Sequence, residues 1–139
     1  KNLIQILSPN FESGGLEGAL EALIQQYESD IKISLQIDEA SENLSAQQLL
    51  GAYRIIEQAL LNTVVHGPVK QVEIAISVSS AGKVEVSVSD DGPGAEIGKL
   101  KPGVGSAIID SWVGILNGQK FIDTAPGRGY RIQISFSRM

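Results

Sequence analysis

The residues most suited to chemistry form the acidic, glycine-rich stretch DDGPG at positions 90–94, which follows an alternating strand pattern over residues 84–88. A carboxylate at a strand end can accept a hydrogen bond from an exocyclic amine, and neighbouring glycines let a flat ring approach the backbone closely. The stretch therefore suits a heteroaromatic ring, with Asp90 as the acceptor and Gly92 and Gly94 beside it. Asp-Gly and Pro-Gly are also common turn dipeptides, so a simple loop is the alternative.

A second group of polar residues lies on a long predicted helix. Gln58, Asn62 and His66 recur at four-residue steps and so share one helix face. The amide oxygen of Asn62 is a suitable ligand for Mg²⁺, which prefers oxygen. His66 would also interact favourably with the helix dipole without any further role, and Asn62 could simply be solvated. The helix therefore offers a metal ligand, with a structural explanation left open.

A third candidate is the loop that contains Lys99, Lys101, Gly103 and Gly105. A glycine-rich loop that opens a helix presents backbone N–H groups to an anion, and the helix dipole adds to the attraction. The two lysines add positive charge. The spacing matches neither a Walker A loop nor a GxGxxG motif. A further glycine turn at 127–129 is either a tight hairpin or one wall of a base pocket.

These residues must be positioned by eight predicted elements. Hydrophobic periodicity predicts helices over 14–29, from an N-cap at Ser45 to His66, and over 105–116; it predicts strands over 31–38, 71–79, 83–90, 120–123 and 130–137. Strands and helices do not alternate regularly, which disfavours a doubly wound parallel sheet. The order predicts an α/β (α+β) two-layer sandwich, a mixed sheet covered on one face by three helices.

Composition excludes several classes of function. The 139 residues suit one domain, and the absence of Cys excludes disulfides and thiolate metal sites. A net charge of -5 argues against nucleic acid as a partner. No apolar run approaches the roughly 20 residues of a membrane span, and no signal peptide is evident, so we expect no membrane contact and a cytoplasmic location. Because the chain begins with Lys1, we expect it to be a piece of a longer protein, with residues 1–10 as a linker tail and 11–139 as the domain.

Together the motifs resemble the ATP-binding catalytic domain of sensor histidine kinases, in the gyrase–HSP90–histidine kinase–MutL superfamily. Residues 54–67 resemble its N box, 90–94 its DxGxG box, 103–106 its second glycine box and 127–131 its last glycine motif. Residues 14–37 resemble the opening helix and strand of the nitrate-sensor-like and DesK-like kinases. The resemblance covers nearly the whole chain and implies the Bergerat ATP-binding fold.

The resemblance implies a role for each matched residue. Asp90 would bind the adenine amine, with Gly92 and Gly94 packed against the base. Asn62 would coordinate a Mg²⁺ ion that bridges the phosphates, and His66 would lie near them; both count as catalytic. The remaining nucleotide-binding residues would be Lys99, Lys101, Gly103, Val104, Gly105, Ser106 and Tyr130.

Three positions depart from the family pattern. Gln58 stands where the ATPases usually have a Glu that activates water, and a neutral amide cannot act as a general base near neutral pH. Val65 replaces a basic residue that is frequent before the His. Tyr130 replaces a Thr that helps the Asp to hold adenine. Gln58 counts against an ATPase but affects a histidine kinase less, because its nucleophile is an imidazole.

The implied function is binding of Mg²⁺-ATP and donation of the γ-phosphate to a histidine on a separate dimerisation domain, in two-component signal transduction. His66 is the only His in the sequence and lies in the N box, so we expect no autophosphorylation by this chain alone. The chain itself is expected to be monomeric, with a response regulator as an indirect partner. The alternatives are a degenerate nucleotide-binding or protein-interaction module, an anti-sigma-factor-type serine kinase, and a purely structural domain.

Overall fold

The computed structural model describes residues 9, 11–12, 14–96 and 104–138, which form one five-stranded sheet and three α-helices. In chain order the elements are α2 (Gly15–Gln25), β1 (Lys32–Ile37), the 3₁₀ helix η1 (Glu39–Asn43), α3 (Ala46–His66), β2 (Gln71–Val78), β3 (Lys83–Asp90), α4 (Val104–Ile115), β4 (Gln119–Thr124) and β5 (Tyr130–Ser137). None of the helices in these described ranges is long and apolar enough to cross a membrane.

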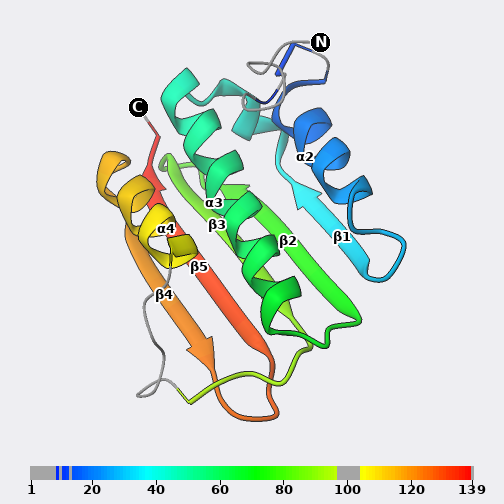
Figure 1. The fold of residues 1–139 in the computed structure, drawn as a ribbon. Helices are drawn as coiled ribbons and strands as arrows, with labels where there is room; N and C mark the ends of the chain where they lie inside the picture. The colour runs from blue at the N-terminus through cyan, green and yellow to red at the C-terminus, as the bar shows by residue number, and fades with distance from the viewer. Residues whose placement is uncertain (1–8, 10, 13, 97–103, 139) are drawn as a thin grey trace.

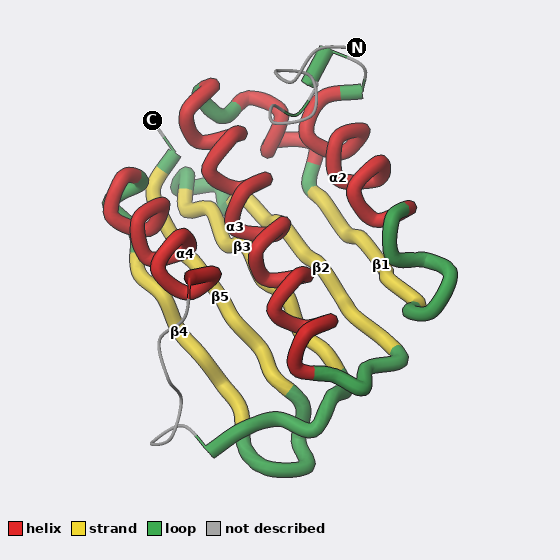
Figure 2. Tube along the Cα trace, in the orientation of Figure 1, coloured by secondary structure: helices red, strands yellow, loops and turns green. Residues whose placement is uncertain are grey.

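The sheet is mixed, with the strand order β1-β2-β3-β5-β4. Only β1 and β2 run parallel, and the other neighbouring pairs are antiparallel. Figures 1 and 2 show α2, α3 and α4 side by side on one face of the sheet, as a separate layer. The predicted two-layer architecture, with a mixed sheet under three helices, is confirmed.

Alternation along the strands explains this layering. In β2 the buried residues Val72, Ile74 and Ile76 alternate with Glu73, which is exposed. A strand places successive side chains on opposite faces, so its buried residues pack against the helices and the remaining ones form the other face of the sheet. The same pattern in β3 leaves Asp90, at its end, on the helix-facing side.

The longest helix, α3, begins and ends close to where the sequence predicts. The Ser45 side chain accepts a hydrogen bond from the backbone N–H of Gln48, and the Gln48 side chain accepts one from the backbone of Ser45, which completes a capping box. The helix ends at His66, with Gly67 as its C-cap. These caps fix the register of the candidate residues on α3.

The end of the first helix and the short helix η1 differ from the prediction. The first helix is shorter than the predicted range 14–29, because it ends at Gln25 and residues 26–30 form turns. The last buried side chain of that segment is Ile24, so little apolar burial favours a further helical turn. The short helix η1 was not predicted, since a five-residue 3₁₀ turn has no periodicity to recognise.

Helices α3 and α4 approach each other closely at Gly51. A Cβ atom at this position would lie 3.0 Å from both the Trp112 ring and a Leu116 methyl group, tighter than most real contacts. Glycine therefore lets α4 pack directly on α3. This contact places α4 beside the helix face that contains the candidate residues.

Candidate functional site

The carboxylate of Asp90 is held by two donors from different parts of the fold. Its Oδ1 accepts a hydrogen bond from the backbone N–H of Gly92 at 2.8 Å, and its Oδ2 accepts one from the hydroxyl of Thr63, on α3, at 3.0 Å. Asp90 is half-buried, and Thr63 is buried. Each carboxylate oxygen has a further lone pair, so the group is fixed in orientation and can still accept from a ligand.

The adjacent Asp91 has a different role. Its Oδ1 accepts hydrogen bonds from the backbone N–H groups of Lys70 and Gln71, at 2.9 and 3.0 Å, where β2 begins. These backbone donors, that of Gln71 first, lower the pKa of Asp91 below its ordinary value. The carboxylate of Asp91 is therefore bound to the start of β2, which leaves Asp90 as the candidate ligand residue.

Glycines allow the segment after β3 to lie against neighbouring backbone. Gly94 has a φ of +68°, and a Cβ atom there would overlap the carbonyl oxygen of Ala125. Gly129 has a φ of +76°, and a Cβ atom there would overlap the carbonyl oxygen of Asp90. Only glycine satisfies both the backbone conformation and the space at these positions.

The same segment is bonded to the turn between β4 and β5. The buried hydroxyl of Thr124 donates to the carbonyl oxygen of Gly129 at 2.6 Å and accepts from the backbone N–H of Ala95 at 3.0 Å. The backbone N–H of Gly127 donates to the carbonyl oxygen of Pro93 at 2.7 Å. The glycine turn thus supports the backbone around Asp90, as one wall of a site would.

Asn62 lies on the side of α3 that faces α4. It is three helical turns from Gly51, where α4 packs, and residues at that spacing share a face. Asn62 is half-buried, and no hydrogen bond of its side chain is found among the described residues. His66, one turn further on, is exposed. Since Thr63 follows Asn62 directly, the hydrogen bond from Thr63 to Asp90 brings the two candidate residues to the same end of the fold.

The residues at this site suit a magnesium ion that is held mainly by water and by the phosphates of a bound substrate. The described residues contain no cluster of three or more His, Asp or Glu side chains that could hold a metal alone. Mg²⁺ commonly keeps several waters and uses one or two protein oxygens with substrate phosphates. The amide oxygen of Asn62 is suited to be such a single protein ligand.

Tyr130 faces the helices next to Asp90. The two residues are partners in the register of β3 and β5, and Tyr130 is half-buried. Burial raises the pKa of the Tyr130 phenol, and the negative charges of Asp90 and Asp110 raise it further. The phenol therefore remains neutral near these two carboxylates at neutral pH.

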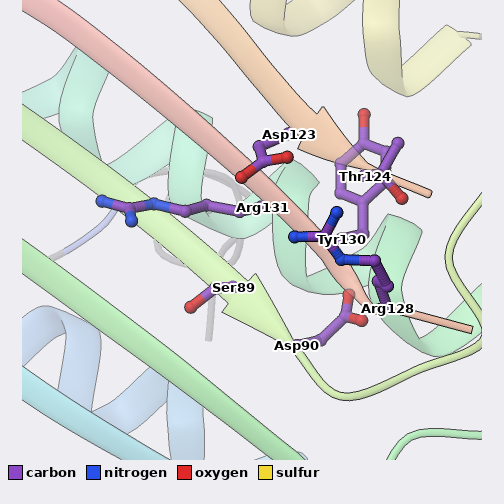
Figure 3. A pocket seen from close by; sticks show the side chains of 7 residues that line it. All are labelled: Ser89, Asp90, Asp123, Thr124, Arg128, Tyr130 and Arg131. Carbon is purple, nitrogen blue, oxygen red and sulfur yellow. The ribbon is translucent and has the colours of Figure 1, made fainter. Parts of the chain in front are cut away.

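A hollow of about 100 Å³ opens at the ends of β3, β4 and β5. Figure 3 shows the residues that line it, which are Ser89, Asp90, Asp123, Thr124, Arg128, Tyr130 and Arg131. It includes Asp90 and Tyr130, but Asn62 and His66 lie outside it. Binding pockets for organic ligands usually measure roughly 300–1,000 Å³, so this hollow alone is too small for a nucleotide. We therefore define the candidate site by the hydrogen bonds of Asp90 and the position of Asn62.

The remaining predicted residues lie between Lys99 and Ser106. Lys99, Lys101 and Gly103 lie outside the described residues. Val104 and Gly105 are the first residues of α4, and the half-buried Ser106 follows them. The start of α4 thus falls one residue earlier than predicted.

Two threonines in the site were not identified from the sequence. Thr63 lies on the buried face of α3, where it could be taken for a core residue, although its place next to Asn62 was a signal. Thr124 ends a short strand; its acceptor Gly129 lies just across the following turn, but its donor Ala95 is 29 residues away. Neither contact could be found from local periodicity.

Comparisons with known proteins identify relatives of this chain and of its fold. A sensor histidine kinase from Bacillus subtilis (strain 168), ComP, is 28% identical over 125 residues, which cover 86% of this chain and 16% of that protein. The histidine kinase domain of the blue-light activated kinase from Erythrobacter litoralis EL346 has a TM-score of 0.73 at 20% identity, over 88% of this chain and 59% of that one.

Full-length ShkA, solved in complex with AMPPNP, has a TM-score of 0.71 at 20% identity, over 95% of this chain and 31% of that one. These structural likenesses support the fold. The family model for histidine kinase-, DNA gyrase B- and HSP90-like ATPases matches residues 47–138, a span that includes Asn62 and Asp90. Because this match extends over more than half of the sequence, the chain belongs to the histidine kinase-, DNA gyrase B- and HSP90-like ATPase family, and its resemblance to the ATP-binding domain of sensor histidine kinases is confirmed.

Proposed function

We propose that the chain binds Mg²⁺-ATP and presents the γ-phosphate to a histidine on a separate dimerisation domain. The observation that carries the proposal is the carboxylate of Asp90, which is oriented by Thr63 and Gly92 and lies at the same end of the fold as Asn62. An oriented acceptor suits the exocyclic amine of adenine, and the amide oxygen of Asn62 suits the metal at the phosphates.

Phosphoryl transfer depends mainly on positioning and on stabilisation of charge. When bound, the magnesium ion would neutralise charge on the phosphate oxygens. Asn62 would hold it, and Asp90 would fix the base at the other end of the nucleotide. The segment from Lys99 to Ser106 would supply donors for the phosphates, and the exposed His66 would lie near them without accepting the phosphoryl group.

The contacts of Glu57 support an imidazole nucleophile over water. Glu57 forms an ion pair with Arg54 at 2.9 Å, and it lies about 100° around the helix from Gln58, which shares a face with Asn62. The neutral amide of Gln58 cannot deprotonate water, whereas a histidine acceptor is itself a nucleophile. The same argument disfavours the serine kinase alternative, whose hydroxyl nucleophile would need a base.

We propose that the domain acts in the cytoplasm with ATP as its ligand. A response regulator would be the protein that finally receives the phosphoryl group. The chain spans 16% of the length of ComP, so the acceptor domain would be supplied by other parts of a longer protein. We propose residues 11–139 as the nucleotide-binding unit and 1–10 as a linker.

Isothermal titration calorimetry with a non-hydrolysable ATP analogue tests the binding step. We expect measurable heat and a rise in melting temperature that require Mg²⁺ for full affinity. Transfer is tested by mixing the chain with a histidine-containing dimerisation domain of its parent and labelled ATP, with detection of acid-labile label on that domain. No heat and no thermal shift at millimolar analogue would refute the proposal.

One observation favours a second candidate function. Tyr130 is half-buried on the helix-facing side directly opposite Asp90, where a base would lie. If its ring excludes the nucleotide, the domain would be a degenerate module that binds a protein. The calorimetric experiment distinguishes the two: a site blocked by the Tyr130 ring gives no nucleotide heat in the wild type and gains it in a Tyr130→Thr variant, whereas the proposed function gives heat in the wild type.

A further inference from the structure

We propose that Thr63 is a positioning residue for base recognition, because its hydroxyl fixes the carboxylate of Asp90 toward the amine of the base. The inference rests on the proposed nucleotide function and adds a residue to it. The evidence is the hydrogen bond from the Thr63 hydroxyl to Asp90 Oδ2, which is 3.0 Å long and joins residues 27 positions apart.

The hydroxyl of Thr63 is not required by the core. The side chain is 7% exposed, and valine would fill nearly the same volume without a polar atom. A hydroxyl costs free energy to bury unless it is hydrogen-bonded, and in a helix it usually bonds the carbonyl one turn earlier. Here it bonds a carboxylate on β3 instead, so the hydroxyl of Thr63 acts to hold Asp90 in place.

The hydrogen bonds of Asp90 determine which group of a base the carboxylate can bind. Gly92 donates to Oδ1 and Thr63 donates to Oδ2, so rotation of the carboxylate would break one bond or the other. The lone pairs that remain are acceptors with fixed directions. Such a group binds the exocyclic amine of adenine but offers no donor to the oxygen that replaces this amine in hypoxanthine.

No other side-chain hydroxyl in the described ranges bonds Asp90. Tyr130 is opposite Asp90 in the strand register, yet no hydrogen bond joins their side chains. Thr124, the other nearby threonine, donates to Gly129. The orientation of the carboxylate therefore depends on α3, the helix that also contains Asn62. The adjacent residues Asn62 and Thr63 would thus act on the metal and on the base of the same nucleotide.

The test compares ADP with inosine diphosphate, which lacks the amine. Calorimetry is performed on the wild type, Thr63→Val and Thr63→Ser, with melting temperatures as a control for folding. We expect Thr63→Val to weaken ADP about ten-fold while it changes inosine diphosphate less than about two-fold, because only the amine uses the oriented carboxylate. Thr63→Ser keeps the hydroxyl and should restore most of the affinity for ADP.

Two outcomes overturn the inference. An equal loss for both nucleotides in Thr63→Val would mean a general structural defect, and an unchanged affinity for both would mean that Thr63 does not act on the base. In the Asp90→Asn background, Thr63→Val should have no further effect on ADP, whereas additive losses would contradict action through Asp90. If the wild type binds ADP and the ratio is unchanged, the inference alone fails; if the wild type binds no ADP, the proposed function fails as well.

Discussion

The backbone N–H of Ala95 donates a hydrogen bond to the hydroxyl of Thr124, 29 residues further along the chain, at 3.0 Å. Since the same hydroxyl donates to the carbonyl oxygen of Gly129 at 2.6 Å, one buried side chain joins the segment after β3 to the turn before β5. The glycine-rich segment around Asp90 is therefore fixed by tertiary contacts as well as by its own turn geometry.

We expect Thr124→Val to lower the free energy of unfolding by about 1–3 kcal/mol, because it leaves the half-buried N–H of Ala95 and the buried carbonyl of Gly129 without their partner. Urea denaturation measures the change. Thr124→Ser keeps the hydroxyl and loses only the methyl group, so it should lose less stability; a loss as large as that of Thr124→Val would mean that the hydrogen bonds are not the main contribution of Thr124.

Gly129→Ala is expected to destabilise the domain strongly, because the new Cβ atom would overlap the carbonyl oxygen of Asp90. Gly127→Ala is the matched control: its φ of +79° is similar, but a Cβ atom there would meet nothing within 4 Å. Conformational strain alone costs roughly 1–2 kcal/mol, so the thermal midpoint of Gly129→Ala should fall well below that of Gly127→Ala. Equal midpoints would contradict the close approach.

Asp90→Asn should weaken adenine nucleotides by about ten-fold or more, since the amide exposes a donor where the carboxylate has only acceptors. The fold should tolerate the change, because the amide can accept from Gly92 and donate to the hydroxyl oxygen of Thr63. Calorimetry with ADP, together with melting temperatures, measures both effects. Unchanged affinity would remove Asp90 from the base site.

Asn62→Ala should reduce nucleotide affinity more in the presence of Mg²⁺ than in EDTA, because the amide oxygen is proposed as the metal ligand. Asn62 is half-buried and no bond of its side chain is found in the described residues, so stability should change little. Titrations with an ATP analogue under both conditions give the comparison, and equal losses would assign Asn62 a role in packing.

Asp91→Asn should make the thermal midpoint change less with pH in the acidic range. Backbone N–H donors hold the pKa of Asp91 below its ordinary value of 3.8, so its contribution is present above pH 3.8 and is lost as pH falls through the lower, folded-state pKa. The amide oxygen still accepts from Lys70 and Gln71 but lacks the charge. Thermal midpoints of the two proteins should therefore differ at pH 6 and approach each other as pH falls below 3.8; a constant difference would contradict this account.

The sequence predicted the order and type of the main elements because periodicity and caps are local. Ser45 and Gly67 bound α3 as expected, and alternation identified all five strands. The end of the first helix was misplaced because Tyr27, only partly buried, continues the helical pattern into a turn.

The candidate site was predictable only in part. Asp90 could be separated from its neighbour by motif spacing, and the structure gives the physical reason, since Asp91 bonds the start of β2. The threonines could not be found, because Asp90, the partner of Thr63, and Ala95, the donor to Thr124, are 27 and 29 residues away and are brought close only by the tertiary fold. Side-chain contacts across layers leave no periodic trace in a sequence.

The two adjacent aspartates bond different elements, Asp90 the hydroxyl of Thr63 on α3 and Asp91 the backbone at the start of β2. A single-residue deletion or insertion before Asp90 would shift the chain by one position in β3 and bring a different side chain opposite Thr63. The length of this segment is therefore under tighter constraint than its composition, and we expect evolutionary drift here to proceed by substitution and not by gaps.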